Sequence, residues 1–163
     1  VAIYSIGQQL YRAGGALIGS VSRVLYTQMT ATKDYVLLKK ITIQSLLALT
    51  LGLPVVYLFG YELLQWAFKI ESKELFNISQ IFYVSLFFVV VSAYWGYPAL
   101  TAIDKEYYAH IGILLGSAIY FILYSTLYFL NQTSLIYLVI IILISDFVGM
   151  ALRVHFARKF GVL

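Results

Sequence analysis

The sequence LIYLVIIILISDFVGMALRVHF, residues 135–156, decides the fold class. A bilayer core of about 30 Å is spanned by about 20 helical residues at about 1.5 Å of rise each, and this run is apolar over that length. The whole chain shares the bias, with 62% hydrophobic and 11% charged residues. A soluble domain carries roughly 25% charged residues. We therefore predict a membrane protein, because no polar segment is long enough to cover such runs in a soluble fold.

Four further segments have the length of a membrane span. Residues 41–60, 78–100 and 109–130 are predominantly apolar. Residues 3–29 are long enough but less apolar, because they include glutamine and arginine side chains. Short loops between the segments favour antiparallel neighbouring helices. We predict one all-α domain over residues 1–163, a polytopic transmembrane helix bundle of about five spans.

Basic residues are divided unevenly between the two sides of the predicted bundle. One side has only Lys69 and Lys73, and three acidic residues surround them. The other side has a basic group consisting of Lys33, Lys39, Lys40, Lys105, Arg153, Arg158 and Lys159. Lysine and arginine are enriched in cytoplasmic loops. This predicts that the chain enters from outside and that its C-terminus is cytoplasmic.

Several kinds of chemistry lack their sequence signatures. The chain has no cysteine, which removes disulfides, zinc clusters and thiol catalysis. His110 and His155 have no second ligand at suitable spacing, so no metal is expected. Phosphate-binding glycine loops, HExxH motifs and nucleophile elbows are also missing. We expect no enzyme, no cofactor and no nucleic-acid partner.

The polar side chains of residues 3–29 fall on one face of the predicted helix. At about 100° per residue they occupy an arc of roughly 80°. The face consists of Ser5, Gln8, Arg12, Gly15, Gly19, Arg23 and Tyr26. Arg12 lies about ten residues, or ~15 Å, from the outer end, whereas Arg23 can extend to the inner interface. A charge as deep as Arg12 needs a hydrated cavity that attracts an anion or a partner on a neighbouring helix.

Glycine and proline mark points where the helices pack or break. Gly15 and Gly19 have the small-xxx-small spacing of close helix packing, and a flexible point for rocking is the alternative. Pro54 predicts a kink inside the second span, and Pro98 predicts the end of the third. Residues 61–77 are charged and are expected to form a short amphipathic surface helix or a loop.

Asp146 is the one acidic residue well inside an apolar span. Gly149 and Arg153 follow it at i+3 and i+7 and therefore lie on a similar helix face. Three roles stay open for its carboxyl group. The first is a site for a proton or cation, the second is a counter-charge for Arg12, and the third is a structural hydrogen bond near the inner interface.

Three stretches resemble the polysaccharide and O-antigen flippases of the multidrug/oligosaccharidyl-lipid/polysaccharide exporter superfamily. Residues 1–30 resemble the family's eighth helix, although Thr27 stands where many members have proline. Residues 96–108, GYPALTAIDKEYY, resemble the passage from the tenth helix to the eleventh. The third stretch is the Asp146-bearing last span with its basic end, ALRVHFARKF. The resemblance runs over nearly the whole chain, in order and with the expected loop lengths.

The resemblance implies helices eight to twelve of a twelve-helix transporter in the bacterial cytoplasmic (inner) membrane. The absence of an initiator methionine before Val1 agrees with a missing N-terminal lobe, which would be a partner along with membrane lipids. The implied cargo is a lipid-linked oligosaccharide, such as the O-antigen unit of lipopolysaccharide, moved by alternating access. Arg12, then Arg23, would bind its diphosphate, Gln8 would bind sugar hydroxyls, and Asp146 would line the cavity.

Three alternatives stay open. Another exporter of the same superfamily, such as a drug/cation antiporter or a lipid II flippase, would share the fold. A membrane-embedded polysaccharide polymerase or ligase usually carries a large outer loop with catalytic arginine or histidine, and the longest outer loop here is short and lacks arginine. A non-transporting subunit of a membrane complex would turn the polar face of residues 3–29 toward a partner protein.

Overall fold

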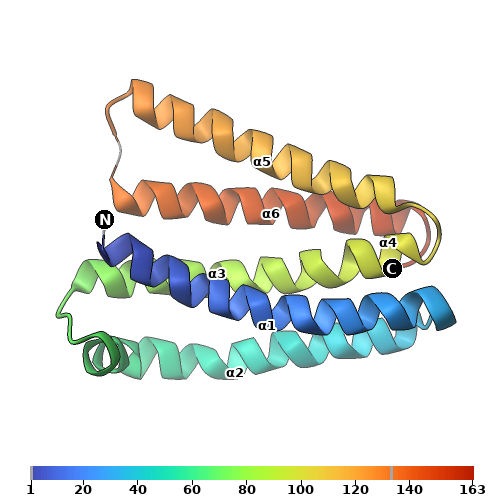
Figure 1. Cartoon of the computed structure of the whole chain (residues 1–163), viewed down its shortest axis with the longest axis horizontal. Helices are drawn as coiled ribbons and strands as arrows, with labels where there is room; N and C mark the ends of the chain where they lie inside the picture. Colours follow the sequence, from blue (N-terminus) through green and yellow to red (C-terminus); the bar gives the residue numbers. More distant parts are fainter. Residues whose placement is uncertain (1, 133) are drawn as a thin grey trace.

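The computed structural model describes residues 2–132 and 134–163, and Val1 and Thr133 lie outside the described residues. The described residues form helices without strands (Figure 1). The helices are α1 (Ala2–Thr32), α2 (Tyr35–Phe68), α3 (Lys73–Trp95), α4 (Tyr97–Thr101), α5 (Glu106–Phe129) and α6 (Leu135–Lys159). The predicted all-α fold is confirmed.

Four helical stretches within the described residues are long and apolar enough to cross a membrane: 35–68, 73–101, 106–129 and 135–159. Their surfaces carry large apolar side chains that the bundle leaves open, such as Leu51, 76% exposed, and Phe121, 70% exposed. Lipid solvates such side chains, whereas water does not. The chain is therefore a multi-pass membrane protein. α1 has the length of a span but is outside this set, so the fifth crossing stays a prediction.

The helices run antiparallel and bring the chain connections to two ends of the bundle (Figure 1). The α1–α2 and α4–α5 connections and the C-terminus share one end, and the α2–α3 connection lies at the other. This arrangement matches the sides assumed in the charge count, although several of the counted residues lie in helices and not in loops. Lys39 and Lys40 lie near the start of α2, Lys73 begins α3, and Arg153, Arg158 and Lys159 lie in α6. Which end faces the cytoplasm stays a prediction.

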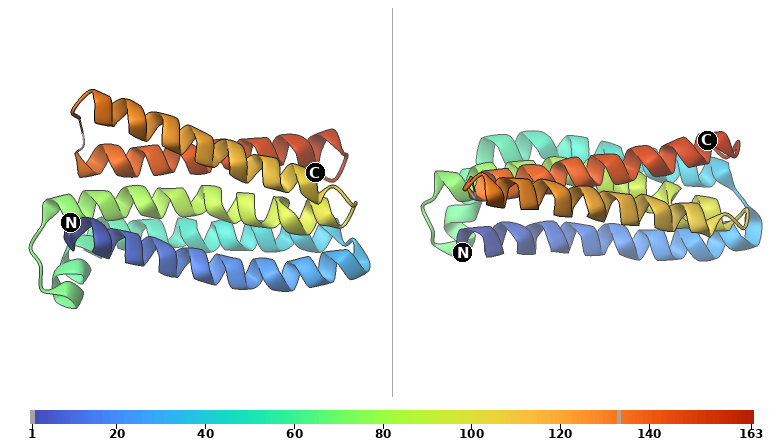
Figure 2. Two further views of the ribbon diagram at one scale, coloured as in Figure 1. Left: turned by 45° about the horizontal axis from the view of Figure 1, so that its top comes forward. Right: turned by 90° about the horizontal axis from the view of Figure 1, so that it is seen from above.

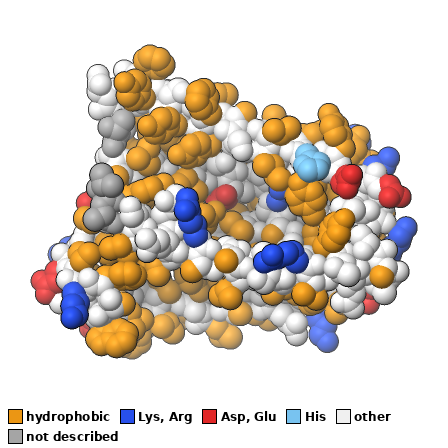
Figure 3. All heavy atoms as spheres, in the orientation of Figure 1, with side chains coloured by type: hydrophobic (Ala, Val, Ile, Leu, Met, Phe, Trp, Pro, Cys, Tyr) orange, Lys and Arg blue, Asp and Glu red, His pale blue; other side chains and the backbone are white. Residues whose placement is uncertain are grey.

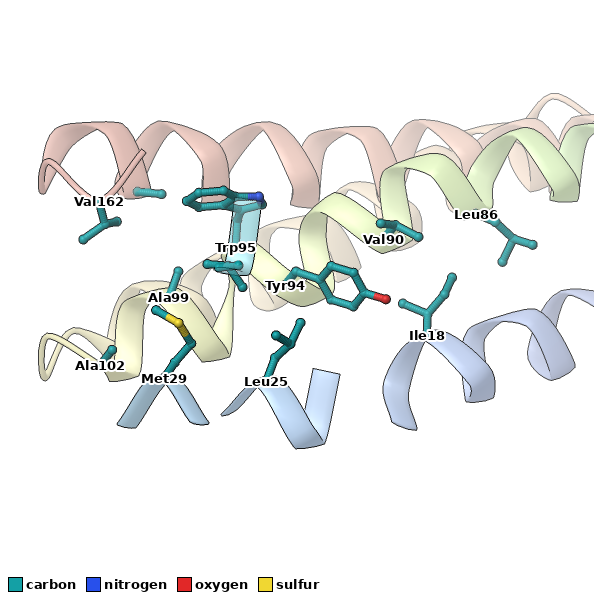
Figure 4. Close-up of a cluster of buried hydrophobic side chains, with 12 residues drawn as sticks. Ile18, Leu25, Met29, Leu86, Val90, Tyr94, Trp95, Ala99, Ala102 and Val162 are labelled. Carbon is teal, nitrogen blue, oxygen red and sulfur yellow. The ribbon is translucent and has the colours of Figure 1, made fainter. Parts of the chain in front are cut away.

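α3 is central, because it packs against α1, α2 and α6. α1 meets it with residues spaced by three or four, the repeat of one helix face: Gly7, Tyr11, Gly14, Ile18, Ser22, Leu25 and Met29. Figure 4 shows the inner part of this contact, where Leu25 lies toward Tyr94 and Met29 toward Ala99. The polar face of α1 points elsewhere. A Cβ at Gly15 or Gly19 would meet nothing within 4 Å, so among the described residues these two glycines do not take part in the predicted close packing.

α2 is longer than the predicted span at both ends. Asp34 starts the helix, because its carboxylate accepts the Leu37 N–H at 2.9 Å. The helix remains continuous through Pro54 and ends at Phe68, and its last turns point aside from the main axis (Figure 2). Ser72 then caps α3 by accepting the Leu75 N–H at 3.2 Å. Residues 61–77 are therefore mostly the end of α2 and the start of α3.

The third predicted span is broken near its end. Gly96 interrupts the helix between α3 and α4, and Pro98 stands in the first turn of α4. Proline has no N–H to donate and fits the first turn of a helix. Orphan carbonyls of the last α3 turn gain partners from elsewhere, since the Ser22 hydroxyl donates to the Ala93 carbonyl at 3.0 Å. The sequence predicted that the span ends at Pro98. In the structure the helix breaks two residues earlier, at Gly96, and a further short helix follows to Thr101.

Small residues allow α5 and α6 to cross closely. A Cβ at Gly116 would lie 3.3 Å from the Ser145 carbonyl oxygen, and one at Gly149 would lie 3.6 Å from the Gly112 carbonyl oxygen. The Ser145 hydroxyl donates to the Gly116 carbonyl at 2.8 Å. Gly112 and Gly116, and Ser145 and Gly149, each have the small-xxx-small spacing of membrane helix pairs. Beyond the crossing the two helices diverge toward their connection (Figure 1).

Candidate functional site

A hollow of about 300 Å³ lies between α1, α3, α5 and α6. Figure 3 shows this hollow on the face of the molecule between α1 and α5, with charged side chains visible inside it. α6 contributes Ser145, Asp146, Gly149 and Arg153 to its wall, and α1 contributes Tyr11. The small residues of the α5–α6 crossing create the space, because they leave no side chains to fill it.

Asp146 is held by a tyrosine from another helix. The Tyr11 hydroxyl donates to the Asp146 carboxylate at 2.7 Å, a short charge-assisted bond. Tyr11 itself is fixed by stacking on Phe82 of α3, with ring centroids 5.0 Å apart. α1 packs mainly on α3 and makes few other contacts with α6, so this bond links the two helices across the edge of the hollow.

Arg153 reaches from α6 to the break in α3. Its Nη1 donates to the Ser92 carbonyl at 2.9 Å and to the Ser92 hydroxyl at 2.6 Å. The aliphatic part of the Arg153 side chain passes between two glycines, since a Cβ at Gly96 or Gly112 would lie 3.0 Å from its carbon atoms. A cation at the C-terminal end of α3 is stabilised by the helix dipole. The buried Nε has no hydrogen-bond partner among the described residues, so the guanidinium is only partly satisfied.

The two charges stand at different levels of the hollow. Asp146 and Arg153 are seven residues apart on α6, which is about two turns or roughly 10 Å along the axis. Asp146 is paired with a hydroxyl group, and Arg153 is paired with a backbone carbonyl and a hydroxyl group. The hollow therefore offers a site for a cation or hydroxyl near Asp146 and a site for an anion near Arg153.

The structure separates the predicted site residues. Asp146 lines the hollow, whereas Gln8, Arg12 and Arg23 are not among its lining residues. Arg12 and Arg23 are exposed on α1, and Figure 3 shows basic side chains over α1 at the edge of the hollow. Among the three roles left open for Asp146, a hydrogen-bonding group is observed, with Tyr11 rather than Arg12 as its partner. Whether Gln8, Arg12 and Arg23 contact a substrate stays a prediction.

The sequence prediction missed Tyr11, Ser92 and Arg153 as site residues. The spacing of Asp146, Gly149 and Arg153 at i, i+3 and i+7 already placed them on one helix face, which was the available signal for Arg153. Tyr11 and Ser92 have no comparable signal, because their roles depend on which helices become neighbours.

Metal chemistry has no cluster of ligands in the part of the chain that the structure describes: no group of three or more His, Asp or Glu residues lies together there. Comparison with known proteins adds no functional assignment, since no protein-family model, no curated protein and no solved structure matches the chain. The charged hollow is therefore the feature on which a function is proposed.

Proposed function

We propose that this chain is part of a transporter that moves an anionic, lipid-linked oligosaccharide across the bacterial cytoplasmic membrane by alternating access. The observation that carries the proposal is the hollow itself, which has an acid and a base in its wall and lies among membrane-length helices. The resemblance of residues 1–30, residues 96–108 and the Asp146-bearing last span with its basic end to polysaccharide flippases supplies the cargo class.

Charged groups inside a membrane bundle are costly, and they mark the paths of polar substrates. The helix break beside them lies near one end of the third span, where the last carbonyls of α3 have no partner within their own helix and can bind polar groups. Here Arg153 binds the last turn of α3 just before the Gly96 break. The α3–α4 break, the cationic Arg153 side chain and the hollow thus occur together.

The proposed substrate has a diphosphate and sugar hydroxyls. The guanidinium of Arg153 suits a phosphate oxygen, and Arg12 and Arg23 add positive charge along α1. In the proposed full protein, a preceding N-terminal lobe would close the hollow from the open side, and the chain would cross the membrane five times with a cytoplasmic C-terminus. A drug/cation antiporter is the second candidate, because the Asp146 carboxylate lies in the same wall.

Water in the hollow can be tested by cysteine labelling in a cysteine-free version of the full-length protein. Ser117 is exposed and lines the hollow, whereas Leu114 on the same helix is 68% exposed outside it. With a membrane-impermeant maleimide, Ser117→Cys is expected to react at least about tenfold faster than Leu114→Cys, because the reactive thiolate forms in water and not in lipid.

A second matched pair tests the polar face of α1. Gly15→Cys is expected to label, and Leu17→Cys, which starts from a 73% exposed apolar position, is not. Equal labelling within both pairs would contradict a hydrated hollow. Protection of Gly15→Cys alone would favour a partner protein on this face and hence the non-transporting subunit.

Transport itself tests the cargo and the role of Arg12. The full-length protein is expected to translocate lipid-linked oligosaccharide in proteoliposomes, and Arg12→Ala is expected to lower the rate about tenfold. Arg12→Lys retains the charge and is expected to lose less. Unchanged rates in both variants would remove Arg12 from the mechanism. Transport of an organic cation in place of the sugar would favour the antiporter.

A further inference from the structure

We propose that the bundle binds an anionic phospholipid in a groove at the end where α2 begins. This site lies apart from the charged hollow and does not depend on the proposed transport function. The groove has a volume of about 490 Å³ and lies between the first turns of α2, the end of α3 and the residues that follow α6.

One wall of the groove is a single face of α2. It consists of Tyr35, Val36, Lys39, Thr42 and Ile43, which span about 12 Å along the helix. The opposite wall includes Trp95 and Val162. Figure 4 shows Val162 and Trp95 at the same end of the buried cluster as Ala102. The wall formed by Trp95 and Val162 is therefore part of the buried core.

The groove is apolar except at one point. The Thr42 hydroxyl is already used, because it donates to the Leu38 carbonyl at 2.8 Å. The exposed Lys39 is the charged residue of the lining. No carboxylate lies within ion-pair distance of its ammonium among the described residues. An occupant must therefore combine a hydrocarbon chain with one anionic group, which describes a phospholipid with a negative headgroup.

The surroundings favour this occupant over a neutral lipid. Basic residues outnumber acidic ones two to one at this end of the bundle, namely Lys33, Lys39, Lys40, Lys105, Arg158 and Lys159 against Asp34, Asp104 and Glu106. Basic pockets between helix ends bind anionic headgroups, at about 1 kcal/mol for each lysine near the membrane surface. Tyr35 and Trp95 are aromatic residues at helix ends, the usual level of the membrane interface.

The test uses the purified full-length protein in a neutral detergent and native mass spectrometry of the lipid that it retains. Phosphatidylglycerol is expected to be retained about fivefold better than phosphatidylcholine with the same acyl chains. Lys39→Ala is expected to abolish this preference, and Lys39→Arg to preserve it. The matched control is Lys73→Ala at the opposite end of the bundle, which is expected to change nothing.

Two further measurements are needed. One distinguishes a lipid headgroup from a soluble phosphate compound, and the other is a second groove variant that keeps the test valid if Lys39→Ala fails to fold. Ile43→Trp fills the groove and is expected to reduce retention of both lipids without changing Lys39. Glycerophosphoglycerol, the headgroup without its acyl chains, is expected to compete poorly. Equal retention of the two lipids in the unmodified protein, a preference that survives Lys39→Ala, or an equal effect of Lys73→Ala would overturn the proposal. Full competition by the free headgroup would replace the lipid by a soluble phosphate compound.

Discussion

Replacing Asp146 by asparagine is expected to lower transport of the lipid-linked sugar at least about tenfold while thermal stability stays nearly unchanged. Asparagine retains an oxygen that can accept the hydrogen bond which Tyr11 now donates at 2.7 Å. The substitution therefore removes the charge and keeps the contact between α1 and α6. A loss of transport would then report on the charge alone.

Tyr11→Phe is the complementary change, because it keeps the carboxylate and removes its donor. The carboxylate is part-buried, and losing the donor that another helix supplies to it costs about 1–3 kcal/mol. Tyr11→Phe is therefore expected to lower the Tm of the purified protein by several degrees. In the double variant Tyr11→Phe/Asp146→Asn much of this stability should return, since the neutral amide tolerates a missing donor better.

A tyrosine outside the hollow provides the control for these two variants. The Tyr83 hydroxyl donates to the Leu49 carbonyl at 2.7 Å, between α3 and α2. Tyr83→Phe removes a hydrogen bond of similar length and is expected to cost stability without reducing transport of the folded protein. Normal transport by Asp146→Asn would remove the carboxylate charge from the mechanism and leave Asp146 a structural role.

The extent of the helices could largely be predicted from the sequence, because membrane length and apolar composition determine them. The runs 109–130 and 135–156 correspond closely to α5 and α6. The run 41–60 was predicted too short, since only the apolar part of that helix was counted. In the structure the Asp34 cap starts that helix ahead of Lys39 and Lys40.

The site could be predicted only where one residue was exceptional in its own segment. Asp146 stands out as a lone acid in an apolar run. Arg153 does not, because a basic residue near a span end is usual at an interface. Its position against Ser92 follows from the close α5–α6 crossing and from the Gly96 break, and both depend on which helices meet.

The first helix shows the same limit in another form. Its polar face was predicted from the periodicity of Gln8, Arg12 and Arg23. Its packing face also follows a regular spacing, but it mixes Gly7 and Gly14 with larger residues and so has a weaker hydrophobic signal. These glycines fit against α3, since a Cβ at Gly14 would lie 2.7 Å from Leu86. The shape of the partner helix decides this contact, and composition does not show it.

Arg153→Met is expected to reduce transport about 10- to 100-fold, because a charge-assisted bond to a phosphate oxygen contributes about 1.5–3 kcal/mol. Stability is expected to change little. The Ser92 carbonyl retains the Gly96 N–H at 3.0 Å, and methionine fills the space of the stem without leaving an unpaired charge. Removing a partly satisfied buried charge also relieves a desolvation cost that offsets the lost hydrogen bonds.

Arg153→Lys separates charge from geometry. Lysine retains the positive charge but has a single nitrogen. In Arg153 the Nη1 group alone donates to both oxygens of Ser92, and lysine has no second nitrogen that could donate to a phosphate oxygen at the same time, so transport is expected to fall about tenfold. Arg158→Met, an exposed basic position later on the same helix, is the control and is expected to transport normally. If Arg153 served only to join α6 to the end of α3, Arg153→Met would lower the Tm by several degrees, and transport would fall only as the protein unfolds. Measuring both quantities on the same preparations therefore distinguishes a substrate-binding arginine from a helix-joining one.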